Sequence, residues 1–211
     1  MRHPFASSRD PMSHSTPPTI AVIVASTRTR RFADHPLAWT RSRLAERDDL
    51  NVDVIDLREH PLPFYDLANP PAIAPRHYAS EEHRALGARF DAADGFFVIT
   101  SEFNHGYPAA LKNSLDHYLV EFRRKPIAFL GYGNVGGSRA IEQLRQVSAE
   151  LDMVSIKPTV NILGTQMPAV RKGGDESAAV LTGHVPKFNL TIHELLWWAN
   201  ALRPAREADA A

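Results

Sequence analysis

The feature that most constrains the fold is a repeated rhythm: a short apolar run, then turn residues, then a helical pattern. Four runs have the length of a strand, and we expect a fifth strand over 154–163. The four runs are Thr19–Ala25, Val52–Leu57, Gly95–Thr100 and Pro126–Gly131. The first, third and fourth are apolar nearly throughout, which is typical of parallel strands covered on both faces. The second alternates, so we expect it at an edge of the sheet.

Apolar residues recur at helical spacing between these runs, for example at Leu111, Leu115 and Leu119, and a final helix is expected over 189–202. Strands that alternate with helices across short links predict a doubly wound α/β sheet. Two stretches break the rhythm. The Pro-rich stretch 58–80 predicts a long loop after the second strand, and the Gly-containing stretch 166–186 is expected to stay irregular.

Length and composition restrict the remaining possibilities. The chain has 211 residues, and we expect one domain over 19–204, with a disordered tail over 1–18 and a frayed tail over 205–211. The absence of cysteine excludes thiol catalysis and thiolate-bound metals. Balanced charges, 24 basic and 24 acidic, argue against nucleic-acid binding. No apolar run approaches the length of a membrane span, and no secretory signal is visible, so we expect a cytoplasmic protein without membrane contact.

Ligands of open α/β sheets bind where the strands end, so the turn after the first strand is a candidate site. This turn combines the hydroxyls of Ser26 and Thr27 with the guanidinium groups of Arg28, Arg30 and Arg31. Hydroxyls, arginines and the N–H groups at a helix N-terminus suit a phosphate monoester. The alternative is a solvated basic loop in which Ser26 caps the helix, and residue types alone leave both open.

The turn after the third strand carries groups that can meet a flat heteroaromatic ring. Phe103 and Tyr107 offer planar surfaces, Asn104 offers an amide, and Gly106 allows close backbone approach. For His105 an exposed loop histidine is the simpler interpretation. An exposed ion pair on the following helix is likewise the simpler interpretation of Lys112 and Asp116.

The turn after the fourth strand, Gly131–Gly137, matches Gly-x-Gly-x-x-Gly and raises the alternative of a nicotinamide-only Rossmann dehydrogenase. In a Rossmann domain this motif follows the first strand, and an acidic residue ends the next strand. Here the motif follows the fourth strand, and the next expected strand, 154–163, contains no acidic residue. A tight turn or the closing of a pocket is therefore the preferred interpretation. No hydrolase elbow occurs, and because Trp197 stands where a metalloprotease has its second histidine, no metal site is predicted.

These three turns together resemble the NAD(P)H-dependent FMN reductase family. The residues that carry the resemblance are Ser26-Thr27-Arg28-x-x-Arg31, the run Glu102 to Asn113, and Gly131-Tyr132-Gly133 to Ala140. The resemblance implies a flavodoxin-like fold with a five-stranded parallel sheet in the order 2-1-3-4-5. It also implies bound FMN, NADPH or NADH as co-substrate, and reduction of a quinone, azo compound, flavin or oxyanion.

The resemblance further implies which residues hold FMN. Ser26, Thr27, Arg28 and Arg31 would hold its phosphate, while Glu102, Phe103, Asn104, Gly106 and Gly133 would surround the ring. No side-chain acid or base is obligatory, because flavin N5 carries the hydride, and the N–H groups of 104–106 are candidates to hydrogen-bond the ring. This chain departs from the family at Ser101, where proline is common.

A second functional interpretation also fits an FMN site: an electron carrier or sensor without hydride chemistry of its own. Neutral net charge speaks against a carrier, which needs a one-signed surface for steering. The expected partners are a small-molecule electron acceptor and a second copy of the chain, in a homodimer or homotetramer. The Pro-rich stretch and the Trp197-Trp198 helix are candidates for that contact.

Overall fold

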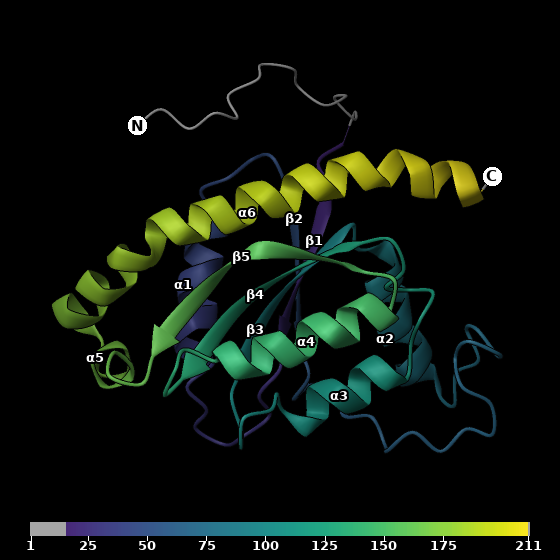
Figure 1. The fold of residues 1–211 in the computed structure, drawn as a ribbon, viewed down its shortest axis with the longest axis horizontal. Coiled ribbons are helices and arrows are strands. Elements are labelled where there is room, and N and C mark those ends of the chain that lie inside the picture. Colours follow the sequence, from purple (N-terminus) through teal and green to yellow (C-terminus); the bar gives the residue numbers. More distant parts are fainter. Residues whose placement is uncertain (1–15, 211) are drawn as a thin grey trace.

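The computed structural model describes residues 16–210, and its centre is a parallel sheet of five strands (Figure 1). The strands are β1 (Thr19–Val24), β2 (Asn51–Asp56), β3 (Gly95–Ser101), β4 (Pro126–Gly133) and β5 (Val154–Leu163). Their order is β2-β1-β3-β4-β5, and every neighbouring pair is parallel. This confirms the flavodoxin-like α/β fold and the edge position of β2, and it differs from the Rossmann order.

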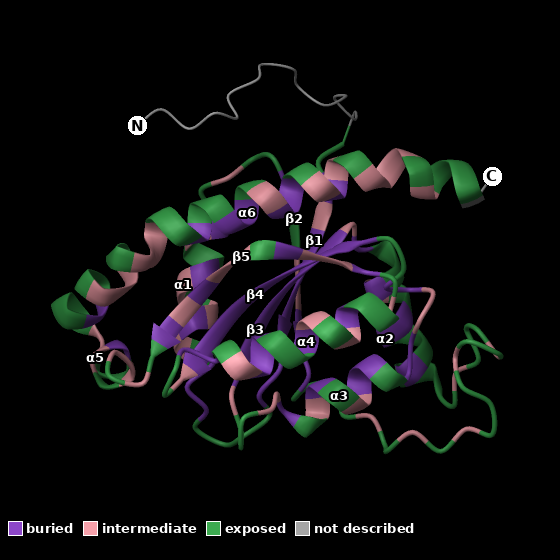
Figure 2. Ribbon diagram, viewed as in Figure 1, coloured by how far each residue is buried: buried purple, intermediate pink, exposed green. Residues whose placement is uncertain are grey.

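Helices cover both faces of the sheet, and each face has its own apolar core. One core lies under α1 (Asp34–Leu44) and the long α6 (Gly174–Ala210). The other lies under α2 (Glu81–Ala92), α3 (Ala109–Asp116) and α4 (Ser138–Glu150). Figure 2 shows the central strands buried along most of their length, as their continuous apolar runs predict. Within the described residues, no helix is both long and apolar enough to cross a membrane.

The stretch 166–186 is helical, so the prediction of an irregular segment was wrong. It forms α5 (Met167–Lys172) and the first third of α6, which begins at Gly174 rather than near 189. Gly173 and Gly174 adopt φ angles of 79° and 66°, which separates the two helices without starting a long loop. The side chains of Val180 and Leu181 then pack against the core under α6. Pro186 is accommodated inside the helix.

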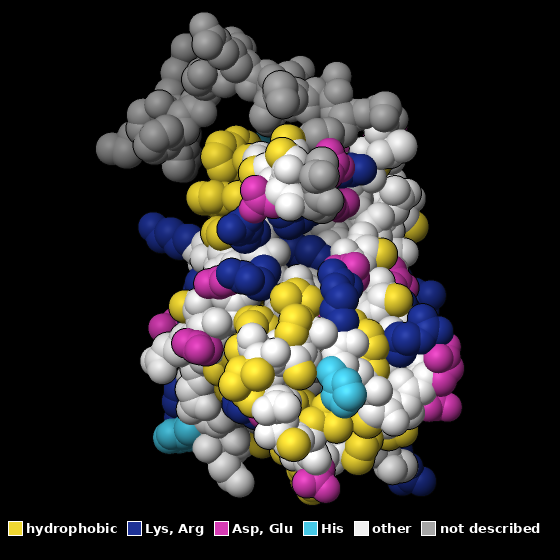
Figure 3. Space-filling model, turned by 90° about the vertical axis from the view of Figure 1, so that its right-hand side faces the viewer, with side chains coloured by type: hydrophobic (Ala, Val, Ile, Leu, Met, Phe, Trp, Pro, Cys, Tyr) yellow, Lys and Arg dark blue, Asp and Glu magenta, His cyan; other side chains and the backbone are white. Residues whose placement is uncertain are grey.

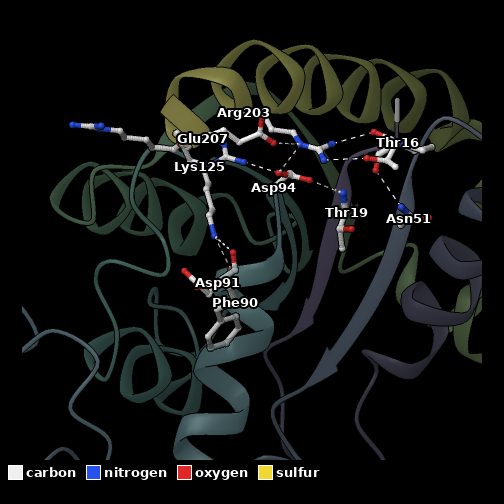
Figure 4. Close-up of polar contacts among 12 residues, drawn as sticks. Thr16, Thr19, Asn51, Phe90, Asp91, Asp94, Lys125, Arg203 and Glu207 are labelled. Atoms are coloured by element: carbon white, nitrogen blue, oxygen red, sulfur yellow. Dashed lines mark hydrogen bonds and ion pairs between the residues drawn. The ribbon is translucent and has the colours of Figure 1, made fainter. Parts of the chain in front are cut away.

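Helix α6 continues to Ala210, through residues for which the sequence predicts a frayed tail. Its last turns are bonded to the sheet at the edge where the strands begin. Arg206 donates to Asp94 at 2.6 Å. Asp94 also accepts from the N–H of Thr19 at 2.9 Å, as Figure 4 shows. Arg203 adds two hydrogen bonds to Thr16. These contacts hold the last turns of the helix against β1 and β3. Most of the expected N-terminal tail lies outside the described residues.

The Pro-rich stretch forms the predicted long loop between β2 and α2, on the right in Figure 1. Asn113 fixes its first part by donating to the carbonyl groups of Leu62 and Pro63 at 3.1 and 2.9 Å. Two large apolar side chains of the loop remain exposed, Phe64 (83%) and Ile73 (71%). Figure 3 looks at this side of the molecule and shows hydrophobic side chains gathered in its lower half, below a group of lysines and arginines near the end of α6.

Candidate functional site

The carboxyl ends of β1, β3 and β4 open into a pocket of about 250 Å³, which we call the arginine pocket. Parallel strands bring their carboxyl ends to one edge of the sheet, so the three turns singled out in the sequence meet there. The pocket is lined by Ser26, Arg28, Arg30, Arg31, Phe32, Ser101, Glu102, Phe103, Tyr132, Gly133, Met167 and Arg171. Its walls therefore come from all three turns and from α5.

Arg31 is the most buried of these arginines, and its guanidinium is already occupied. Its Nη1 donates to Asp56 at 2.7 Å and to the carbonyl of Ser26 at 2.5 Å, and its Nη2 donates to the second oxygen of Asp56. Its Nε donates to Asp34 at 2.8 Å. Burial alone would raise the pKa of Asp56, but the hydrogen bonds from Arg31 and from the Arg58 N–H outweigh it and lower the pKa. Arg31 thus fixes the loop to the end of β2.

The turn after β3 is held rigidly. Phe103 and Gly106 exchange two backbone hydrogen bonds of 2.8 and 2.9 Å, and the residues between them, Asn104 and His105, have φ angles of 50° and 69°. This is the geometry of a type I′ turn, in which asparagine tolerates positive φ well. Because the Gly106 N–H is used inside the turn, only the N–H groups of Asn104 and His105 remain candidates to meet a ligand.

The first turn of α4 supports this β3 turn through Arg139. The side chain of Glu102 is 5% exposed and pairs with Arg139, whose Nε donates to it at 2.5 Å. Arg139 Nη1 also lies 2.8 Å from Nε2 of His105, and Gln143 donates to the His105 carbonyl at 3.1 Å. His105 is therefore exposed, as expected, but it is not a free loop residue. Since a guanidinium can only donate, the His105 Nε2 accepts.

The glycine-rich turn after β4 closes tightly on itself. A Cβ added to Gly131 would lie 2.5 Å from the carbonyl oxygen of Gly136, and Gly136 and Gly137 have φ angles of 67° and 73°. These positions need glycine for space and conformation. Gly133 borders the arginine pocket, where an added Cβ would lie 3.3 Å from the Cβ of Glu102. The turn thus matches the tight-turn interpretation and opens one side of the pocket.

Charge in the arginine pocket is strongly unbalanced. Glu102 is neutralised by Arg139, and Arg31 is neutralised by its two aspartates. Within residues 16–210, no carboxylate forms an ion pair with the three remaining guanidinium groups, those of Arg28, Arg30 and Arg171. Such a set of donors attracts an anion, and planar guanidinium groups match the oxygens of a phosphate.

Comparison with known proteins identifies the family. Residues 18–166 match the model of the family described as NADPH-dependent FMN reductase. The chain belongs to this family. An NAD(P)H-dependent FMN reductase of Schizosaccharomyces pombe (strain 972 / ATCC 24843) is 32% identical over 84% of this chain and 88% of its own length. A 2-hydroxy-1,4-benzoquinone reductase of Burkholderia sp is 33% identical over 64% of this chain and 72% of that protein.

A solved structure agrees with the fold of these reductases. The flavoenzyme NAD(P)H:(acceptor) oxidoreductase FerB from Paracoccus denitrificans superposes with a TM-score of 0.63 at 24% identity. The superposition covers 88% of this chain and 98% of that one. At this level of identity the likeness shows the shared flavodoxin-like fold.

The structure brings most of the residues expected to bind FMN together. Ser26, Arg28, Arg31, Glu102, Phe103 and Gly133 all line the arginine pocket. Asn104 and Gly106 belong to the turn that carries Phe103. Thr27 instead lines a neighbouring pocket of about 300 Å³, formed with Asn113, Leu62 and others on the opposite side of the loop. The exposed pair expected for Lys112 and Asp116 is present, with two contacts of 2.6 Å.

Two residues expected to bind FMN make ion pairs within the protein. Arg31 was expected to hold a phosphate, but Asp56 and Asp34 occupy its guanidinium because the end of β2 lies beside the loop. Glu102 was expected beside a ring, but its carboxylate is turned to Arg139 and holds the turn in place. Both side chains are held by contacts within the protein, whereas Arg28, Arg30 and Arg171 form no ion pair among the described residues.

Sequence reasoning missed the contributions of Phe32, Ser101, Tyr132, Met167 and Arg171 to the pocket. Ser101 and Tyr132 end two adjacent strands, so strand position alone could have singled them out. Met167 and Arg171 had no such signal, because the segment that contains them was expected to be irregular. Their helix, α5, lies beyond the residues matched by the family model.

Proposed function

We propose that this protein is an NAD(P)H-dependent FMN reductase, which passes hydride from NAD(P)H through bound FMN to a small electron acceptor. The observation that carries the proposal is the juxtaposition of unpaired guanidinium groups with the Phe103 turn in one pocket. A phosphate monoester that bears a flat ring needs both an anion site and a planar surface nearby. The family of the chain and the names of its relatives support the same activity.

The residues of the arginine pocket fit FMN in chemistry and in space. Arg28 and Arg30 supply charge-assisted donors for a phosphate, and the buried Ser26 adds a hydroxyl. Phe103 is 36% exposed and offers an apolar ring surface. Gly133, with a φ of 146°, leaves open the space that a Cβ would fill. We therefore assign the phosphate to Ser26, Arg28 and Arg30, and the ring to the Phe103 turn and Gly133.

Bound FMN would supply the redox chemistry, taking two electrons as hydride from NAD(P)H and delivering them to the acceptor. The protein's own residues bind and orient. Arg139 holds the Phe103 turn through Glu102 and His105, so the N–H groups of Asn104 and His105 are fixed before a ligand arrives. Fixed dipoles of this kind stabilise negative charge that develops during reduction, and no side-chain acid is required.

We propose a quinone or an azo compound as the acceptor, since one relative is named for reducing a benzoquinone and another for azo reduction. We also propose a homodimer or homotetramer that works in the cytoplasm. The exposed Phe64 and Ile73 of the Pro-rich loop, and Trp197 of α6, which is 46% exposed, support a contact between copies. Light scattering tests this, and a monomer would contradict it.

The deciding experiment is the visible spectrum of the purified protein with and without FMN, followed by anaerobic addition of NADPH or NADH. An FMN reductase shows flavin absorbance that bleaches on addition and returns with a quinone. Flavin that does not bleach would favour the carrier or sensor interpretation. Absence of flavin binding under any loading condition would exclude both.

The phosphate assignment is tested by Arg28→Ala. Loss of one charge-assisted contact should weaken FMN binding by more than about tenfold. Arg47→Ala is the matched control, because Arg47 pairs with Asp49 on the surface and does not line the arginine pocket. Fluorescence titration of the apoprotein with FMN measures both. Equal affinities in the two variants would contradict the assignment.

A further inference from the structure

Three hydroxyl groups lie in a row across the floor of the arginine pocket. Ser101 and Tyr132 are direct partners in the register of β3 and β4, and Ser26 follows β1, the neighbour of β3 on its other side. Their exposed fractions are 1% for Ser26, 3% for Ser101 and 4% for Tyr132. Burial raises the pKa of Tyr132 despite the neighbouring hydroxyls of Ser101 and Ser26, so Tyr132 keeps its proton and can donate.

Two of these hydroxyls have no hydrogen-bond partner. The hydroxyl of Tyr132 has those of Ser101 and Ser26 as its polar neighbours, but among the described residues neither Oη of Tyr132 nor Oγ of Ser101 forms a hydrogen bond of normal distance and angle. A buried hydroxyl without a partner is costly, and native structures keep few of them. Because both groups line a pocket, a ligand is the natural partner.

Two arginines that line the arginine pocket each lie against an aromatic ring. The guanidinium carbon of Arg28 lies 5.7 Å from the centre of the Phe103 ring, and that of Arg171 lies 5.9 Å from the centre of the Phe32 ring. The Phe32 ring is in turn 5.0 Å from the ring of Tyr132. These contacts help to hold both guanidinium groups at the pocket that Ser101 and Tyr132 also line.

Helix α5 holds Arg171 in this place. Val170, the preceding residue, is fully buried in the core under α6. The helix begins at a fixed point, because Gln166 accepts from the Leu163 N–H at 2.9 Å and lies 3.2 Å from His184 of α6. The wall that carries Arg171 is thus part of the packed structure, although it lies outside the residues matched by the family model.

We propose that Arg171, Ser101 and Tyr132 bind a phosphoryl group of the nucleotide, which Arg28 also contacts when that group is the 5′-phosphate of FMN. This inference builds on the proposed function and adds residues that neither the family motif nor the sequence assigned. The guanidinium groups neutralise the anion, and the two unpaired hydroxyls donate to its oxygens. Two sources carry this group, the 5′-phosphate of FMN and the 2′-phosphate of NADPH.

The test uses Arg171→Ala, with Lys172→Ala as matched control, because Lys172 is the adjacent residue and pairs with Glu176 on the surface. In the first arm, apoprotein is titrated with FMN and with riboflavin, which lacks the phosphate. In the second arm, KM is measured for NADPH and for NADH with FMN saturating. If FMN is the source, Arg171→Ala weakens FMN binding at least about tenfold and leaves riboflavin unchanged. If NADPH is the source, only the KM for NADPH rises.

Ser101→Ala and Tyr132→Phe separate a binding role from a structural one. Because the hydroxyls have no partner in the protein, their removal should leave the urea midpoint of the apoprotein unchanged or higher. Each of these variants should also lower the affinity for the ligand whose binding Arg171→Ala weakens, by about three- to tenfold. Loss of stability with unchanged affinity would overturn their assignment.

Failure of the proposed function is distinguishable from failure of this inference. A wild-type protein that binds no flavin would contradict the proposed function. Calorimetric titration with inorganic phosphate would then test, independently of flavin, whether the arginine pocket binds a phosphoryl group. Phosphate binding that Arg171→Ala abolishes and Lys172→Ala preserves would support the pocket. The inference is overturned if Arg171→Ala changes neither FMN affinity, nor the ratio of the two KM values, nor phosphate binding.

Discussion

At the scale of single residues, the contact between Arg31 and Asp56 joins the loop after β1 to the end of β2. Both side chains are almost fully buried, with exposed fractions of 1% and 8%. Asp56→Asn removes the buried negative charge and one of the two oxygens that accept from Arg31, and it places an amide N–H₂ donor against the guanidinium, so that the remaining charged partner is Asp34. Breaking one side of a buried pair costs about 3–5 kcal/mol, so we expect a loss of that size in the free energy of unfolding, measured by urea denaturation.

Asp116→Asn is the control for this prediction. Asp116 forms an ion pair with Lys112 in which both carboxylate oxygens are also contacted, but both side chains are more than 40% exposed. An exposed pair contributes about 0–1 kcal/mol, so this variant should unfold almost like the wild type. An equal loss of unfolding free energy in the two variants would show that burial of Asp56 does not increase its contribution to stability.

The same pair shows where sequence reasoning stops at this scale. The types Ser, Arg and Phe, and their places after strands, were enough to bring Ser26, Arg28 and Phe103 to one pocket. The sequence did not show that Asp56 binds the Arg31 guanidinium. Asp56 is 25 positions away, and the two residues come into contact only because β1 and β2 are neighbours in the sheet. Which arginine is free depends on a contact that a local motif does not encode.

At the scale of secondary structure, α2 and the end of α3 enclose two histidines, His83 and His117, whose rings lie 4.6 Å apart. His83 is 2% exposed and accepts from the Ala79 N–H at 3.1 Å. Burial lowers the pKa of His83, and the nearby His117 lowers it further, against weaker opposite effects that include Glu121. Below its unfolded pKa of about 6.5, the unfolded chain binds a proton that the folded chain does not.

Stability should therefore fall as the pH drops below about 6.5 and level off near the lowered folded pKa. For one imidazole that stays neutral in the fold, the loss from pH 7.5 to 5.5 is about 1.4 kcal/mol at most. Urea denaturation at both pH values measures it. His83→Asn, which keeps an acceptor but cannot titrate, should show a smaller loss over this range, while His193→Asn on the exposed face of α6 should behave like the wild type. An equal pH dependence in all three proteins would contradict this.

Helices and strands were not equally predictable. The strands lie within two residues of their expected ends, because a strand covered on both faces is a continuous apolar run. The start of α6 was misjudged by 15 residues, since Gly173, Gly174 and Pro186 are usually signals of a loop. Packing of Val180 and Leu181 on the core overrides these local preferences. Propensity describes the isolated segment, and the missing information was tertiary.

At the scale of the whole molecule, ligand binding and folding are coupled. The arginine pocket exists only when the ends of β1, β3 and β4 and the helix α5 come together, so a ligand of this pocket binds the folded chain and not the unfolded one. The unbound pocket gathers unneutralised guanidinium groups, which repel one another until an anion arrives. An anion that binds removes this repulsion and thereby stabilises all the strands and helices that form the pocket.

FMN should therefore raise the thermal stability of the apoprotein. At a concentration 100 times its dissociation constant, a ligand of the folded state adds about 2.7 kcal/mol. For a domain of this size, 1 kcal/mol corresponds to about 2–4 °C, so Tm should rise by roughly 5–11 °C, and the rise should grow with FMN concentration. Riboflavin at the same concentration is the control, since it keeps the ring and lacks the phosphate. Because the free charge of the pocket comes from arginines, riboflavin should give a much smaller shift, and an equal shift would mean that the ring alone carries the binding energy.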